Sequence, residues 1–90
     1  MDIDGAQVLM ISEKGHYGYI KIFDASDNGI EVCYLAICKY SENNIIYLFL
    51  CDYNISTEQD AVFNSVEEAV ENAQNRSQNP ITWLYPNGKN

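Results

Sequence analysis

The chain has 90 residues, and 13 Asp and Glu against 5 Lys and Arg give it a formal net charge of -8 at pH 7. This length suits a single domain, which we expect to span residues 1–90 with a loose tail at 86–90. So acidic a chain repels phosphate backbones, which excludes direct nucleic-acid binding from the expected functions. Hydrophobic residues make up 47% of the chain, enough for a folded core and too many for a disordered segment.

The cellular setting is indicated by the first residues and by the cysteines. Residues 1–4 include acidic side chains where a secretory signal carries positive charge. The longest apolar run, residues 45–51, is far too short to span a bilayer. Cys33, Cys38 and Cys51 lie inside predicted strands, which indicates buried reduced thiols. We therefore expect a cytoplasmic protein with no membrane partner.

Four β-strands are predicted in the first half of the chain, because four segments rich in Ile, Val, Tyr and Phe contain no proline. The breaks between them are short and polar, and the second break ends in Asn28-Gly29, a strong hairpin signal. Short connections make neighbouring strands pair antiparallel. The sequence therefore predicts a four-stranded antiparallel meander from residues 6–12, 17–24, 30–40 and 45–53.

One helix is predicted after these strands. Ser65 and Glu68 have the spacing of a capping box and precede apolar residues at helical spacing. We expect a helix over residues 66–77 that ends before Pro80, and residues 81–85 could add a fifth, edge strand. The predicted fold class is α+β, with one helix packed on one face of the sheet.

The two faces of the predicted sheet differ in composition when side chains are assigned by strict alternation. The aliphatic face is the expected seat of the helix, and a β-bulge would exchange the faces beyond it. The helix side is expected to hold Leu9, Ile11, Ile20, Ile22, Leu35, Ile37, Ile46, Leu48 and Leu50. The opposite side is expected to hold Val8, Met10, Tyr17, Tyr19, Lys21, Phe23, Tyr34, Ala36, Cys38, Tyr47, Phe49, Cys51 and Tyr53.

The aromatic face is one candidate binding surface, because a single helix covers only one side of a sheet. It could be covered by the C-terminal segment with Trp83, by a second copy in a homodimer, or by a foreign partner. Tyrosine is frequent among the residues that dominate protein interfaces. The partner-binding residues predicted on this face are Tyr17, Tyr19, Tyr34, Tyr47, Phe49 and Tyr53.

Acidic clusters are the second candidate binding surface. Asp24, Asp27 and Glu31 gather at one hairpin end, and a second cluster lies around the helix start. Carboxylates on a rigid scaffold can occupy the cationic groove of a nuclease in place of phosphates and can steer its approach. Solubility alone is the other explanation for this acidity. The second cluster comprises Glu58, Asp60, Glu67, Glu68 and Glu71.

Catalytic and metal-binding patterns are weak in this sequence. His16 is the only histidine, and the predicted strands place no nucleophile beside it. Residues 24–29 resemble the start of a calcium loop, but the twelfth position falls on Leu35, where a bidentate Glu is needed. Cys33 and Cys38 would point to opposite faces of one strand, so they could not share a zinc ion. We expect no enzyme activity, no metal and no cofactor.

In size, acidity and order of strands and helix, the whole chain resembles the small acidic immunity proteins that bacteria keep beside nuclease toxins. The resemblance implies a bacterial, cytoplasmic inhibitor that neutralises a basic toxin or nuclease by tight binding. No motif is shared, so no residue role is transferred. The alternative predictions are a homodimeric structural or adaptor module that buries its aromatic face, and an acidic phage inhibitor that imitates nucleic acid.

Overall fold

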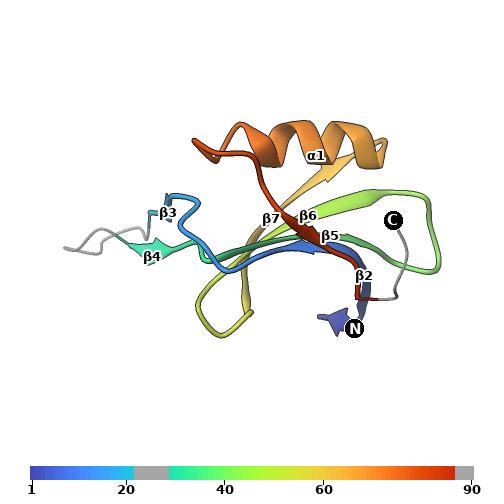
Figure 1. Ribbon diagram of the computed structural model, residues 1–90. Helices are drawn as coiled ribbons and strands as arrows, with labels where there is room; N and C mark the ends of the chain where they lie inside the picture. Colours follow the sequence, from blue (N-terminus) through green and yellow to red (C-terminus); the bar gives the residue numbers. More distant parts are fainter. Residues whose placement is uncertain (22–28, 87–90) are drawn as a thin grey trace.

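A computed structural model describes residues 1–21 and 29–86 as antiparallel sheet with one helix across it (Figure 1). The larger sheet has the strand order β1-β2-β5-β6-β7, and β8 also pairs with β2. The α+β class is confirmed, although the described residues form eight strands in place of four or five. The elements are β1 (Asp2–Ile3), β2 (Ala6–Ser12), β3 (Tyr19–Ile20), β4 (Ile30–Glu31), β5 (Tyr34–Lys39), β6 (Ile46–Cys51), β7 (Thr57–Phe63), α1 (Val66–Gln74) and β8 (Trp83–Leu84).

The predicted meander is wrong at its second strand, because β2 pairs directly with β5. Beyond β2 the chain keeps its direction: Gly15 N donates to Cys33 O, Tyr17 N donates to Val32 O, and β3 then pairs with β4. The two short strands project from one end of the large sheet as a narrow ribbon (Figure 1). Gly15, the residue of the predicted turn best able to adopt a positive φ, does not adopt one. The loop at residues 13–16 therefore does not reverse the chain.

The segment that carries the Asn28-Gly29 hairpin signal connects two antiparallel strands, β3 and β4. Tyr19 pairs with Glu31 and Ile20 with Ile30. Gly29 has a φ of 89°, and a Cβ at this position would collide with the Ile20 carbonyl oxygen. Glycine is therefore required here both for its backbone conformation and for the close approach of the two strands. Residues 22–28, including the rest of the predicted turn, lie outside the described part of the chain.

Strand β7 was not anticipated, and it forms an edge of the large sheet. It pairs with β6 from Ile46 opposite Phe63 to Cys51 opposite Thr57, with a register shift between Leu50 and Cys51. Glu, Gln and Asp occupy its first half, and these residues are poor strand formers. Burial alternates along its second half, where Phe63 reaches the core beneath the helix and Val62 is exposed. Its polar side chains suit an edge, where one side of the strand faces water.

Helix α1 begins where the capping box predicts. The Ser65 hydroxyl accepts a hydrogen bond from Glu68 N at 3.1 Å, and the Glu68 carboxylate accepts one from Asn64 N at 3.1 Å. The helix ends at Gln74, three residues before the predicted end. There the Gln74 side chain donates to Asn79 O and accepts from Ile81 N. These two bonds lead the chain towards β8, the edge strand predicted at residues 81–85, which pairs with the end of β2.

A β-bulge in β2 corrects part of the face assignment. The register shifts between Val8 and Met10, so that Met10 packs beneath the helix and Ile11 on the opposite side, the reverse of strict alternation. Tyr17 also packs on the helix side, because its segment is not the second strand of a meander. The assignments on β5 and β6 are confirmed for both faces. The helix meets the sheet through Ala69, which is fully buried.

The face opposite the helix is a second buried core, and not an open aromatic platform. Half-buried Tyr34, Tyr40, Tyr47 and Ile55 pack against it. Trp83 packs on the helix side, which contradicts one of the three alternatives, that the C-terminal segment with Trp83 covers the aromatic face. The buried members of this second core are Ile3, Ala6, Val8, Ile11, Ala36, Cys38, Phe49 and Cys51.

Candidate protein-binding site

The aromatic residues predicted to bind a partner do not form one exposed surface. Tyr17 and Phe49 are only 8% and 1% exposed, and the Tyr17 hydroxyl donates to the Glu13 carbonyl oxygen at 2.8 Å. Tyr34 and Tyr47 are half-buried at the margin of the second core. Tyr17 moved to the helix side because its segment is not the second strand of a meander, whereas Phe49, Tyr34 and Tyr47 keep the predicted face and pack in the second core there.

The remaining two tyrosines are exposed, and each contacts the segment that follows β2. The Tyr19 ring meets His16 edge-on, with 5.1 Å between ring centres. The Lys14 ammonium lies 4.2 Å from the centre of the Tyr53 ring. A cation–π contact at an exposed site stabilises by about 0.5–1 kcal/mol. Neither ring is therefore a bare aromatic anchor for a partner.

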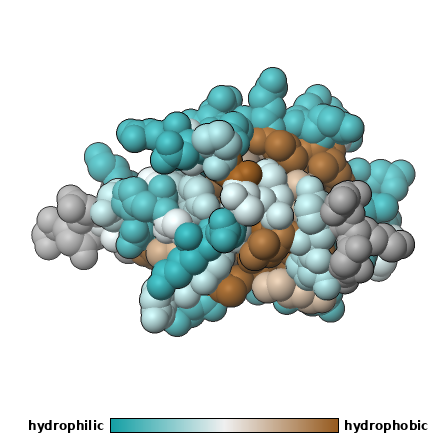
Figure 2. Space-filling view, viewed as in Figure 1, coloured by the Kyte–Doolittle hydropathy of each residue, from teal (hydrophilic) through white to brown (hydrophobic). Residues whose placement is uncertain are grey.

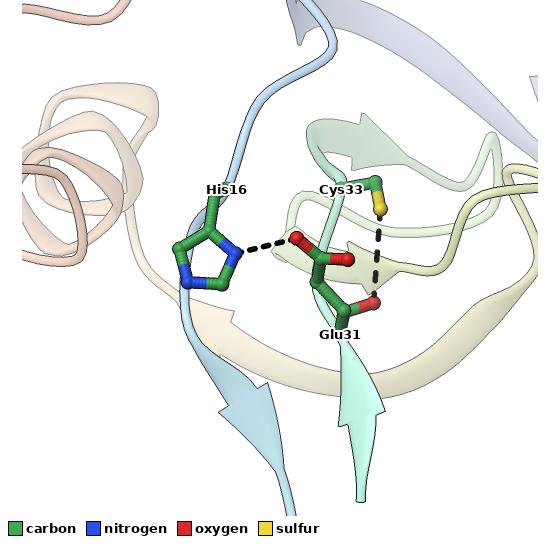
Figure 3. A network of polar contacts seen from close by, with 3 residues as sticks. All are labelled: His16, Glu31 and Cys33. Carbon is green, nitrogen blue, oxygen red and sulfur yellow. Dashed lines mark hydrogen bonds and ion pairs between the residues drawn. The ribbon is translucent and has the colours of Figure 1, made fainter.

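Of the acidic cluster predicted at the hairpin end, Glu31 is the member that the structure describes; Asp24 and Asp27 lie outside the described residues. Glu31 Oε2 lies 2.5 Å from His16 Nδ1, and the Cys33 thiol points towards the Glu31 carbonyl oxygen (Figure 3). The His16 imidazole therefore faces this carboxylate from the neighbouring segment of the narrow ribbon. The sequence does not show this contact, because a two-residue turn at Asn28-Gly29 would place Glu31 opposite a later residue than the observed partner Tyr19.

The acidic side chains predicted on the helix are all exposed. Glu67 and Glu68 lie in the first turn, where the helix dipole favours negative charge. Glu68 also holds the capping bond to Asn64 N described above. Glu71 follows one turn after Glu67 on the same flank of the helix. These three carboxylates thus lie within the first six residues of α1, a helix fixed by its contact with the sheet.

An apolar hollow lies along this flank of α1. Half-buried Val66 and Val70 alternate with Glu67 and Glu71 along it, and Gln74 and Asn75 close it, giving a volume of about 480 Å³. Figure 2 shows hydrophobic side chains along the helix, below its hydrophilic outer surface. The helix therefore offers an apolar contact next to negative charge.

Glu58 and Asp60, which the sequence groups with the helix start, are exposed on β7. Asp60 stands opposite Phe49 of the second core, so it lies on the face of the sheet away from the helix and the cluster is divided. The sequence signal that could have found this strand is the short apolar run at residues 61–63. Backbone hydrogen bonds from Ser56, a bond from the Glu58 side chain and a backbone bond from Asn54 hold the pKa of Asp52 below its usual value. The bond to Asp52, then burial and the charge of Asp52, raise the pKa of Glu58. The two carboxyl groups therefore influence each other's pKa across the β6–β7 turn.

The thiols are buried and unpaired, as the sequence predicts. Burial raises the pKa of Cys38 to about 12 and that of Cys51 to about 11, while the neighbouring Thr57 side chain opposes the rise at Cys51. Burial and the charge of Glu31 also raise the pKa of Cys33. Thiols of this kind are poor nucleophiles at neutral pH. Within residues 1–21 and 29–86, no three His, Cys, Asp or Glu side chains come together to hold a metal ion.

No protein-family model matches this chain, and neither a curated protein nor a solved structure matches it. Among the described residues, no helix has the length and apolar character needed to cross a membrane, and α1 itself is 9 residues long. The chemistry of the exposed surface is therefore the basis on which a function is proposed.

Proposed function

We propose that this chain is a protein-binding module that neutralises a basic protein by occupying its cationic surface. The supporting observation is that its exposed carboxylates lack neighbouring cations: within residues 1–21 and 29–86, His16–Glu31 is the single ion pair. The Lys14 ammonium lies over the Tyr53 ring and not beside a carboxylate. Charge that is not balanced inside the protein is available to a partner of opposite sign and accelerates its approach.

The contact region in this proposal is the acidic surface, defined as Glu67, Glu68 and Glu71 on α1. Core contacts hold α1 in place, so little conformational entropy is lost when a partner binds. The hollow beside Val66 and Val70 adds apolar area, which supplies much of the affinity in protein interfaces. A basic partner with an apolar anchor among its cations fits this combination.

An inhibitor of the bacterial immunity type, acting on a basic toxin or nuclease in the cytoplasm, is the specific form of this proposal. Blocking a cationic active site needs tight binding and no chemistry, which suits a surface of carboxylates and buried, weakly reactive thiols. The homodimer alternative has less support. Tyr17 and Phe49, two of the residues that it needs at the surface, are buried.

The first test is capture of a basic partner from a lysate of the native cell, with elution by salt, followed by kinetics of the purified pair. Reversing two charges of the acidic surface, Glu67→Lys with Glu71→Lys, should lower the association rate constant about tenfold at low ionic strength. The matched control is Glu13→Lys with Glu42→Lys, which changes the net charge equally at exposed positions outside the acidic surface. The control should lower the rate much less.

The outcomes distinguish an effect of where the carboxylates lie from an effect of the total charge of the protein. Equal slowing in both double variants would contradict the acidic surface as the contact region. Unchanged rates in both variants would contradict the electrostatic basis of the proposal altogether. A difference that shrinks as salt rises supports it, because salt screens exposed charges over about 10 Å at 0.1 M.

A further inference from the structure

Strand β7 is the longest uncovered edge of the large sheet. Six of its 7 residues pair with β6 on one side, with a register shift at Glu58, and the strand order ends there. The strand β2, near the other edge, is covered by β1 at its start and by β8 at its end. An edge strand turns the N–H and C=O groups of alternate residues away from its neighbour. In the part of the chain that the structure describes, no segment pairs with the outer side of β7.

The side chains of β7 leave this edge accessible. Glu58, Gln59 and Asp60 are exposed, and Val62 is 60% exposed. Phe63 turns towards the core beneath the helix, just before the chain enters α1. Free backbone groups on a strand of this length are a template for another extended segment.

The charges on β7 disfavour a second copy of this chain as that segment. In an antiparallel pair of β7 strands with a central register, Glu58 and Asp60 lie directly or diagonally opposite the same residues of the other copy. Like charges in these positions destabilise a strand pair. The net charge of -8 on each copy adds long-range repulsion.

The same charges favour a segment of opposite sign. We propose that an extended basic segment of the partner protein pairs with the free edge of β7 and adds one strand to the sheet. The positive charge of this partner is taken from the proposed function, on which this inference therefore rests. Lys or Arg side chains of the segment lie beside Glu58 and Asp60, and an apolar side chain lies beside Val62, which stands opposite half-buried Tyr47 on β6. Backbone bonds supply affinity and these side chains supply specificity.

The test uses the full chain labelled with ¹⁵N and a capped seven-residue peptide in which two lysines and one valine alternate with threonines. Titration should shift the amide signals of β7 and of its neighbour β6, and should slow hydrogen exchange at the outward amides of β7. A peptide of equal charge with proline at its centre should bind about fivefold more weakly, because it loses a backbone donor and the extended pairing. A peptide with glutamates in place of lysines should leave β7 unchanged.

A matched pair of variants tests the role of charge. Glu58→Gln with Asp60→Asn should remove the preference for the basic peptide over a neutral one, while Glu13→Gln with Glu42→Gln should keep it. Shifts confined to α1, with equal binding of the proline peptide, would overturn strand addition while the acidic surface as a site for basic proteins stands. If a neutral peptide bound to β7 as tightly as the basic one, the β7 edge would stand as the site of strand addition, but the basic charge of the partner would be contradicted. Absence of any β7 shift with all peptides would overturn the inference.

Discussion

The two edges of the large sheet differ in how their backbone hydrogen-bonding groups are kept from pairing with other sheets. At the outer side of β2, two-residue strands from near the two ends of the chain form hydrogen bonds with the backbone. At the other side, no described segment pairs with the outer side of β7, which carries Glu58 and Asp60. Both devices prevent uncontrolled pairing between sheets. Only the second leaves the edge accessible, and in the inference proposed above its charge selects a basic partner.

The largest effect is expected from breaking the covered side at Trp83. Its ring packs on the core beneath the helix, and its backbone pairs with Ser12. Trp83→Ala should lower the free energy of unfolding by about 3 kcal/mol, measured by urea denaturation. The Glu13 amide, which donates to Thr82 O at 3.0 Å, should exchange faster. The exposed neighbour is the control: Thr82→Ala should cost less than about 0.5 kcal/mol, and an equal cost would show that the ring does not secure β8.

Removing the charges of β7 should open the second side to self-pairing. In Glu58→Val with Asp60→Val, each lost like-charge contact is worth up to about 1 kcal/mol, so the dimer association constant should rise about tenfold or more. Sedimentation velocity over a concentration series measures it. The control is Gln7→Val, which replaces an exposed polar side chain with valine on β2, where β1 covers the strand. It should leave the dimer association constant unchanged. If the β7 variant sediments like the parent protein, charge is not what protects this edge.

A smaller effect is expected at the corner between β7 and α1. Ser65→Ala removes the acceptor for Glu68 N and should lower the free energy of unfolding by about 1 kcal/mol. The first turn of α1 should lose hydrogen-exchange protection, while β8 keeps its own. Ser41→Ala, at an exposed turn position, serves as the control. Equal losses in both variants would mean that the capping box does not secure this corner.

The smallest effect is expected from the carboxyl pair at the start of β7. The lowered pKa of Asp52 contributes stability that is present above its unfolded pKa and lost as the pH falls through the folded value. The raised pKa of Glu58 acts in the opposite sense: its contribution is present below its unfolded pKa and lost as the pH rises through the folded value. The two contributions partly cancel, so this pair by itself makes stability depend only weakly on pH.

Asp52→Asn separates the two groups, because Asn keeps an acceptor for the N–H groups of Asn54 and Ser56. The pKa of Glu58 should fall towards its ordinary value, as measured by carboxyl NMR titration. A Glu58 titration that is identical in the variant and the parent would show that the two carboxyl groups do not interact.

The parts of the fold that follow from local signals were predictable from the sequence. The capping box sets the start of α1 through contacts within four residues, and the alternation on β5 and β6 sets which face they bury. The pairing of β2 with β5 was not predictable in this way. It depends on the conformation of Gly15, since the same polar segment could reverse the chain or extend it. The bulge after Val8 likewise leaves no local mark that strict alternation detects.

In the candidate site, too, the features set by local sequence were predictable and those set by long-range packing were not. Glu67, Glu68 and Glu71 are exposed as predicted, because their exposure follows from the periodicity of one helix. The aromatic site failed at Tyr17 and Phe49, whose burial depends on long-range packing and on the curvature of the whole sheet. The role of β7 was missed because its edge position compensates for residues that disfavour strands elsewhere.

The three buried thiols have a practical consequence as built-in reporters of opening. An alkylating reagent reaches Cys38 or Cys51 only when the second core separates, so their labelling rates report the population of largely unfolded molecules. Cys33 lies between β4 and β5, beside the narrow ribbon, and its labelling reports fraying of that ribbon. Comparing the rates, after correction for the raised pKa of each thiol, gives a kinetic map of how this sheet comes apart, obtained without introducing any probe.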